Sequence, residues 1–180
     1  MIKSKSGFTI VEMVVVIAVI GILAAITIIT YDNIQMQARD SKRISDLAKI
    51  SDAIQLYRQK NGNDVQSGSG CGGNGNGNGW FNHTNGTGGS YPKSILSCLV
   101  DAGYLDDSFI DPTGCTYGST TYGCPHFYMK YSCVSGGQMI THIYARLETK
   151  DDSQKLIDSN TCSSSAVESS YGMNYMVVAD

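Results

Sequence analysis

The feature that most constrains this chain is an apolar run of 22 residues, from Phe8 to Ile29, that contains only one charged residue. At about 1.5 Å per residue, a helix of this length is roughly 33 Å long, enough to cross the hydrocarbon core of a bilayer. In lipid, a lone segment can satisfy its backbone hydrogen bonds only as a helix. The run therefore predicts a membrane-spanning helix.

Two lysines precede the run and predict its orientation. Lys3 and Lys5 place the N-terminus on the cytoplasmic side, so the rest of the chain is exported. An ordinary secretory signal is the alternative, with Ala24 and Ala25 as a weak cleavage site. The length of the apolar run argues against a secretory signal, which has a shorter apolar core, and so does the acid within the run.

The one acid of the run, Glu12, is a candidate functional residue. A carboxylate in lipid costs a few kcal/mol unless it is paired; a tolerated acid near the interface is the alternative. If the chain were cut between Gly7 and Phe8, the new α-amine of Phe8 would lie four residues from Glu12, on the same helix face. That amine could pair within one subunit, or with a neighbour in a packed bundle, where a matched pair specifies the register.

The opening residues resemble the class III signal and N-terminal helix of type IV pilins and the related pseudopilins. The family pattern is a basic leader ending in Gly, then Phe, then an acid at the fifth mature position and an apolar stretch; Gly7, Phe8 and Glu12 match it in order. The resemblance implies that a prepilin peptidase cleaves after Gly7 and methylates the amine of Phe8. Many family members carry a proline near the end of the run. Here the first proline is Pro92, and Gly21 is the only helix-weakening residue in the run.

The next segment, residues 32–60, is amphipathic. An apolar stripe recurs at helical spacing, formed by Ile44, Leu47, Ile50, Ala53, Ile54 and Tyr57, while Lys42, Asp46 and Lys49 fall on the wetter side. No Gly or Pro interrupts residues 22–61, so we expect one helix from about Phe8 to Lys60, ended by Asn61-Gly62. The stripe needs a partner, which must be the C-terminal region. A free coiled coil is the weaker alternative, because the pattern lasts only about two heptads.

Residues 61–90 are rich in Gly and Asn, a low-complexity composition that predicts a loop. Trp80 and Phe81 either anchor this loop or are exposed for contact, and anchoring is the favoured interpretation. Residues 91–105 then predict a short helix with one apolar face, ended by Gly103.

The C-terminal region predicts a small antiparallel sheet. Residues 127–134 and 139–147 flank a Ser-Gly-Gly-Gln hairpin signal, and residues 171–178 form a third strand. The fold class is therefore α+β, with one sheet face covering the long helix; by resemblance this is also the pilin plan. The predicted organisation is a leader (1–7), a hydrophobic helix (8–31), its amphipathic continuation (32–60) and an exported head domain (61–180).

All six cysteines lie in the exported part: Cys71, Cys98, Cys115, Cys124, Cys133 and Cys162. An even count in such a region favours disulfides over free thiols. Fifteen pairings are possible, and we expect Cys71–Cys98, Cys115–Cys124 and Cys133–Cys162. A metal site is the alternative, but there is no C-x-x-C and the nine-residue spacing is not a zinc pattern.

Two further groups of residues, four acids and three histidines, are candidates for metal binding or catalysis. The acids around one turn are Asp101, Asp106, Asp107 and Asp111. Related pseudopilins hold calcium in a comparable loop, so resemblance makes these weak calcium candidates; solvated turn residues are the alternative. His83, His126 and His142 are accompanied by no catalytic motif, and each is expected to be a surface or hairpin residue. No active site is apparent, so we expect no catalytic residue, no cofactor other than that calcium, and no enzyme.

The charge balance also limits the partners. With 13 basic and 16 acidic residues the net charge is −3, so there is no basic excess for nucleic acid and no specific nucleic-acid partner is expected.

The leading hypothesis is a structural subunit of a type IV pilus-like surface filament, stored in the membrane, cleaved, and polymerised through its N-terminal helix. Filaments of this family serve adhesion, motility or DNA uptake. The implied partners are other copies of the chain, minor pilins, the prepilin peptidase and an inner-membrane assembly platform. One alternative is a pseudopilin of a type II secretion system. Another, from a different class, is a Sec-secreted binding module or enzyme.

Overall fold

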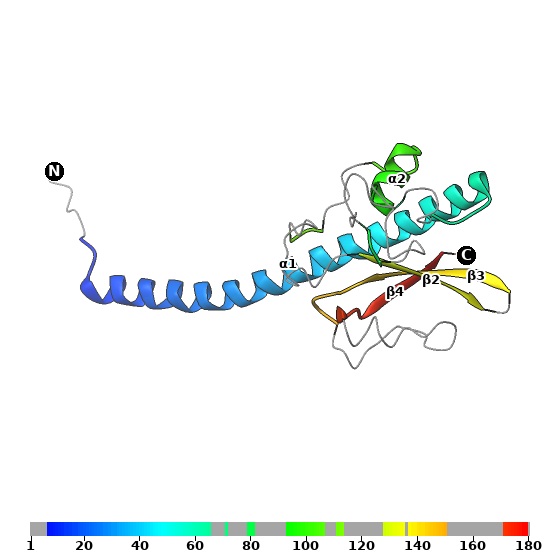
Figure 1. Cartoon of the computed structure of the whole chain (residues 1–180). Helices are drawn as coiled ribbons and strands as arrows, with labels where there is room; N and C mark the ends of the chain where they lie inside the picture. The colour runs from blue at the N-terminus through cyan, green and yellow to red at the C-terminus, as the bar shows by residue number, and fades with distance from the viewer. Residues whose placement is uncertain are drawn as a thin grey trace. The chain divides into compact units, whose positions relative to one another are not determined.

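A long N-terminal helix dominates the computed structural model (Figure 1). The structure describes residues 7–65, 71, 79–81, 93–106, 111–113, 128–135, 137–150 and 171–179. The elements in chain order are α1 (Ile10–Asn61), β1 (Gly79–Trp80), α2 (Ile95–Asp101), β2 (Met129–Ser135), β3 (Gln138–Ala145) and β4 (Tyr175–Ala179). The chain divides into two compact units, Met1–Ala38 and Arg39–Asp180, and α1 contributes to both. The prediction of one continuous helix from about Phe8 to Lys60 is confirmed.

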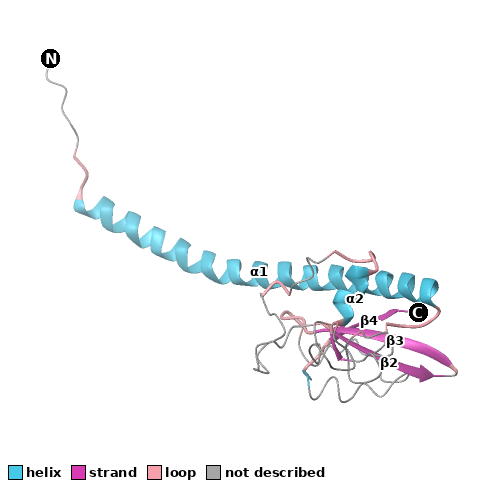
Figure 2. Cartoon of the chain, turned by 45° about the horizontal axis from the view of Figure 1, so that its top comes forward, coloured by secondary structure: helices cyan, strands magenta, loops and turns pink. Residues whose placement is uncertain are grey.

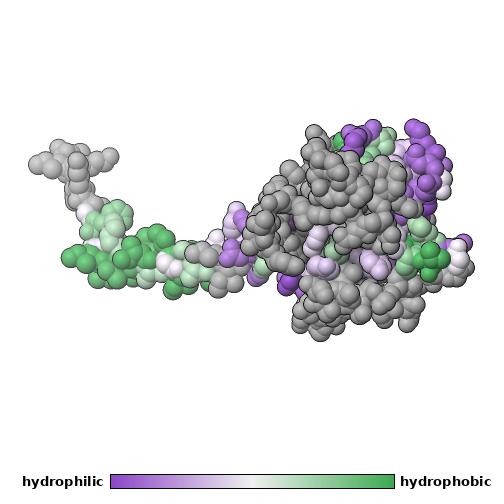
Figure 3. All heavy atoms as spheres, viewed as in Figure 1, coloured by the Kyte–Doolittle hydropathy of each residue, from purple (hydrophilic) through white to green (hydrophobic). Residues whose placement is uncertain are grey.

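In the first unit, α1 presents apolar side chains on every side. The described side chains from Phe8 to Ile26 are all exposed, and Figure 3 shows this part of the helix as an almost uniformly apolar surface. Among the described residues, α1 is the one helix whose length and composition would let it cross a membrane. An exposed apolar surface of this extent is typical of a site that lipid or another molecule covers.

In the second unit, α1 buries one face. Four residues of the predicted apolar stripe are almost fully buried, at the spacings of three and four residues that one helix face requires: Leu47, Ile50, Ala53 and Ile54. The prediction was wrong at two positions: Ile44 remains 37% exposed, and Asp46, assigned to the wetter side, is buried. The helix ends where Gly62 adopts a left-handed φ of 74° and its N–H donates to the carbonyl of Arg58 at 2.9 Å.

The sheet is antiparallel, with strand order β1-β2-β3-β4. The β2–β3 hairpin pairs Ser135 with Gln138 around a two-residue turn, where Gly137 takes a φ of 84° that disfavours other residues. The three predicted strands are present with shifted ends. β1 was not predicted: it lies in the Gly/Asn-rich stretch that was expected to be loop throughout, and it pairs Trp80 with Met129.

The core lies between α1 and one face of this sheet, and both views place the second part of α1 along it (Figures 1 and 2). Ile143 and Ala145 of β3 join Leu47 and Ile54 of α1 in one buried cluster. The α+β prediction is therefore confirmed. Phe81 is buried in the same cluster and its N–H donates to the carbonyl of Tyr128 at 3.1 Å, so anchoring is the correct interpretation for this residue.

α2 is fixed by its cap and by a disulfide. The Ser94 hydroxyl accepts from the N–H of Ser97 at 3.0 Å, an N-cap contact, and Gly103 follows the helix with a φ of 76°, as predicted. Cys98 of α2 forms the expected disulfide with Cys71. Cys133 is also disulfide-bonded. Cys115, Cys124 and Cys162 lie outside the described residues, so their pairings stay predictions.

Candidate functional sites at the N-terminus and in the head

At its N-terminus α1 begins with a reciprocal cap formed by Thr9 and Glu12. The carboxylate of Glu12 accepts from the N–H of Thr9 at 2.8 Å and from its hydroxyl at 2.9 Å, and the N–H of Glu12 donates to that hydroxyl at 3.2 Å. This is a capping box, which satisfies amide donors that a helix start otherwise leaves unpaired. Sequence reasoning missed it, although Thr-x-x-Glu before an apolar run is its signature.

The peptide bond between Gly7 and Phe8 lies just outside this cap. Gly7, Phe8 and Thr9 precede the helix, Phe8 is 78% exposed, and a Cβ built on Gly7 would meet nothing within 4 Å. A peptide bond that is exposed in this way is open to a protease. The predicted pairing of Glu12 with the amine of Phe8 requires the cleaved chain and stays a prediction; in the uncleaved chain, Thr9 binds Glu12.

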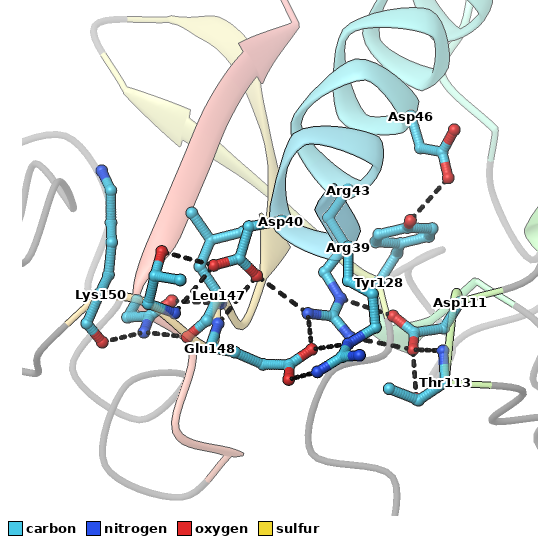
Figure 4. Close-up of polar contacts among 12 residues, drawn as sticks. Arg39, Asp40, Arg43, Asp46, Asp111, Thr113, Tyr128, Leu147, Glu148 and Lys150 are labelled. Carbon is cyan, nitrogen blue, oxygen red and sulfur yellow. Dashed lines mark hydrogen bonds and ion pairs between the residues drawn. The ribbon is translucent and has the colours of Figure 1, made fainter. Parts of the chain in front are cut away.

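The second candidate site is a buried ion cluster, made of Arg39, Asp40, Arg43, Asp111 and Glu148 (Figure 4). Its centre is Arg43, whose side chain is 0% exposed. The Arg43 guanidinium donates to Asp111 through Nε at 2.8 Å and Nη2 at 3.1 Å, and through Nη1 to Asp40 at 3.0 Å and Glu148 at 2.7 Å. Three acids thus converge on one buried arginine.

The remaining members tie the ion cluster to the chain that follows β3. Arg39 binds Glu148 with two parallel hydrogen bonds of 2.8 and 2.5 Å. Asp40 accepts from the backbone N–H of Glu148 at 2.9 Å and from that of Thr149 at 2.8 Å. The Asp111 carboxylate also accepts from the N–H and hydroxyl of Thr113. Each acid therefore has several donors, which a buried charge requires.

These contacts hold the acids in their charged form. The two bonds from Arg39, helped by Arg43, lower the pKa of Glu148 to about 2 against the opposing effect of burial. Burial alone would raise the pKa of Asp40 and Asp111, but the donated hydrogen bonds outweigh it, so both pKa values are lowered. Burial also opposes the charge on Arg43, yet its acid partners raise its pKa. The ion cluster is therefore fully ionised at neutral pH.

Sequence reasoning missed Arg43 because charged residues were assigned to the solvent side. The signal was its position: Arg43 precedes Leu47 by four residues and Ile50 by seven, so it lies on the apolar stripe. Asp46 follows Arg43 by three residues and is also buried. Its carboxylate accepts from the Tyr128 hydroxyl at 2.7 Å and from Lys42 at 2.7 Å. Burial and the neighbouring Asp46 carboxylate raise the pKa of Tyr128, so its phenol stays a donor.

A second buried network lies beyond the C-terminal end of α1, around Asp64. Its carboxylate accepts from Lys130 at 2.9 Å, from Thr141 at 2.7 Å and from Ser132 at 2.8 Å, and both Asp64 and Lys130 are fully buried. Burial lowers the pKa of Lys130. Burial alone would raise the pKa of Asp64, but Lys130 and the hydrogen bonds from Thr141 and Ser132 together outweigh it, so this pKa is lowered. Arg58 of α1 donates to the Thr141 hydroxyl at 2.9 Å. The network joins the end of α1 to β2 and β3.

Two of the four acids proposed for calcium form ion pairs within the chain. Asp111 is occupied by Arg43, and Asp101 forms an exposed pair with Lys93 at 2.5 Å. Asp106 is described and Asp107 is not. Within the described part of the chain, no group of three His, Cys, Asp or Glu side chains could hold a metal ion. Asp107 lies outside the described residues, so calcium binding by these acids stays a prediction.

Of the three histidines, the structure describes His142. It was expected to be a surface or hairpin residue. It lies on β3 in the hairpin and is buried there, and its Nδ1 lies 3.2 Å from the Tyr144 hydroxyl. His83 and His126 lie outside the described residues.

Comparison with known proteins identifies the class of the N-terminal segment. Residues 2–28 match the family model of the prokaryotic N-terminal methylation motif. The chain is 39% identical over 62 residues to the type IV major fimbrial protein FimA of Dichelobacter nodosus, and 32% identical over 59 residues to the type II secretion system core protein G of Aeromonas hydrophila. A fimbrial protein of Pseudomonas aeruginosa is 35% identical over 51 residues.

These matches cover 28–33% of this chain and 33–41% of the relatives, so the chain spans less than half the length of the relatives it matches. No solved structure matches the chain significantly. The resemblance to the type IV pilin and pseudopilin family is confirmed. Residues 2–28 carry the methylation motif, with Gly7, Phe8 and Glu12 within it.

Proposed function

We propose that this chain is a structural subunit of a type IV pilus-like surface filament. It is stored in the membrane with its N-terminus in the cytoplasm, cleaved after Gly7, methylated on Phe8, and polymerised through α1. The observation that carries the proposal is the joint presence of the methylation motif and an exposed apolar helical surface. Both sit at the same end of the chain.

The geometry supports the order of events. The Gly7–Phe8 bond is uncovered, so a peptidase can reach it before assembly. The capping box satisfies Glu12 while the subunit is stored, because three hydrogen bonds link it to Thr9. After cleavage the amine of Phe8 becomes a charged partner for Glu12 of the same subunit or of a neighbour. The apolar helices then pack together and leave the head at the filament surface.

The partners in this proposal follow from the mechanism. A prepilin peptidase acts on the leader, an inner-membrane platform assembles the subunits, and minor pilins join the same filament. The filament would serve adhesion, motility or DNA uptake. The subunit has a structural rather than a catalytic role, in keeping with the names of its fimbrial relatives.

The second candidate is a pseudopilin of a type II secretion system. The match to core protein G of the Aeromonas hydrophila system favours it. Long surface fibres that contain this chain would support the pilus subunit. Loss of protein export on deletion of the gene, without any fibres, would support the pseudopilin.

N-terminal analysis of the protein isolated from its own cells tests both candidates against a Sec-secreted module. We expect intact-mass and N-terminal peptide spectra to show a chain that starts at Phe8 and carries one added methyl group. A Gly7→Leu variant, which changes only the leader side of the bond, should stay uncleaved and unassembled in the membrane. A mature chain that starts near Ile26, or that keeps Met1, would contradict the proposal.

A further inference from the structure

The ion cluster sits at the point where α1 enters the second unit, and its arrangement bears on the register of the helix. The apolar stripe alone sets that register poorly. A shift of α1 by three residues, nearly one helical turn, would bring Ile44 to the place of Leu47 and Leu47 to the place of Ile50. Apolar side chains would still occupy most of the stripe, with Ser51 at the place of Ile54, so burial alone discriminates weakly between the two positions.

The charged residues discriminate strongly. Arg43 is flanked at three residues on either side by acids, Asp40 and Asp46. A three-residue shift in one direction brings Asp40 to the place of Arg43, and a shift in the other direction brings Asp46 there. In both cases a carboxylate would face Asp111 and Glu148, which now bind Arg43 at 2.8 and 2.7 Å. Buried like charges in contact are strongly unfavourable.

We propose that the ion cluster centred on Arg43 is a register lock, which fixes the axial position of α1 on the sheet of the head. Arg43 is a positioning residue that acts through Asp111 and Glu148. Buried ion pairs seldom add stability over apolar side chains of the same volume, but they exclude alternative arrangements. Contacts at the far end act in the same sense, because Arg58 donates to Thr141 at 2.9 Å and to the carbonyl of Ala179 at 3.2 Å.

The lock has a use that rests on the proposed function. In a filament held together by its apolar helices, any pulling force on a head domain is transmitted to the centre of the filament through α1. Arg39, Asp40 and Arg43 lie among the first five residues of α1 inside the second unit. A helix that slid by one turn under load would move the head by about 5 Å along it. The lock prevents that movement while the apolar stripe supplies the burial.

The test uses the full chain in detergent micelles and does not require assembly, so its failure is separate from failure of the proposed function. The variant Arg43→Met/Asp111→Leu removes one charge of each sign and replaces both with apolar volume. With isoleucine methyl labelling, we expect the wild-type spectrum to show one signal each for Ile50 and Ile54, and the double variant to show two or more. A single set of signals at wild-type positions would overturn the proposal.

The single variant Arg43→Met leaves three acids without their central cation. We expect hydrogen exchange of the amides in residues 40–46 to accelerate by about a hundredfold or more, while residues 50–57 change little. Lys42→Met is the matched control, because Lys42 is a neighbouring cation in an i,i+4 pair with its side chain 45% exposed, and it should leave the exchange rates unchanged. Equal acceleration throughout the head, or a double variant that fails to fold, would make the ion cluster a general stabiliser and overturn the lock.

Discussion

The two units of this chain place apolar and charged residues in opposite ways. In the first unit, side chains such as Phe8 and Val16 are exposed and the one acid, Glu12, is bound by its own helix cap. In the second unit, Arg43 and Lys130 are fully buried among acids, and the apolar stripe of α1 is covered by the sheet. The second unit therefore buries its apolar stripe and pairs its buried charges, whereas the first unit exposes its apolar side chains to its surroundings.

Removal of the apolar part of the first unit, residues 1–30, should have the largest effect. A chain that starts at Tyr31 loses the apolar surface but keeps Arg39 and the whole ion cluster. We expect it to be soluble without detergent and to unfold cooperatively, whereas the full chain partitions entirely into membranes. Sedimentation with vesicles and thermal unfolding followed by circular dichroism measure the two properties. A truncated chain that aggregates would show that the head does not satisfy itself.

The next largest effect concerns Glu12. Glu12→Ala removes the only acid of the apolar run, so membrane insertion should be unchanged, but the amine of Phe8 would lack its partner and filament assembly should fall at least tenfold. Immunoblots of sheared surface fractions measure assembly, and Thr9→Val is the control that disrupts the cap while keeping the carboxylate. Normal filaments in Glu12→Ala would remove the role given to this acid.

A matched pair of truncations within α1 sharpens the contrast further. Ile50→Ala removes a fully buried side chain from the core, and we expect it to lower the free energy of unfolding of the head by about 2–5 kcal/mol. Val16→Ala removes an exposed side chain from the first unit, so the head should unfold as in the wild type. Urea unfolding in detergent, monitored by tyrosine fluorescence, compares them. Equal effects would mean that the two units unfold together.

The smallest effect is the dependence on pH. The pKa of Glu148 is about 2 in the folded chain, well below its ordinary value, and those of Asp40 and Asp111 are also lowered. A lowered folded-state pKa gives stability that is complete above about pH 5 and is lost as the pH falls through 4 towards 2.

The melting temperature of the head should therefore fall between pH 5 and 2, and less steeply in Glu148→Gln. Asp101→Asn, which changes an exposed pair with Lys93, is the control and should follow the wild type. A Glu148→Gln variant with the wild-type acid profile would contradict the assignment of this stability to the ion cluster.

Much of the fold was predictable because its signals are local. The apolar run, the unbroken stretch between residues 22 and 61, and the Gly-Gly hairpin turn each determine their own element. The methylation motif at the N-terminus was equally predictable, since its residues follow one another in order. Cys71 and Cys98 were predicted correctly as a pair, although composition alone allowed fifteen pairings.

The contacts that join distant segments were not predictable. Asp111 lies 68 residues from Arg43 and Glu148 lies 105 residues from it, so no local pattern links them. When these acids are not known to lie nearby, an arginine on an apolar stripe is interpreted as a break in the apolar pattern. β1 was missed for a similar reason: two residues amid glycines carry no strand periodicity, and only the edge of β2 defines them.

The Cys71–Cys98 disulfide joins two cysteines with a sequence separation of 27 and so closes a covalent ring that includes most of the glycine-rich stretch. Trp80 and Phe81 fasten that ring to the head at a third point. Because the entropic penalty of a longer ring grows only logarithmically, extra residues inserted within it would leave the helix and sheet undisturbed. The length of this closed segment can therefore change between its fixed points while the helix and the sheet keep their contacts.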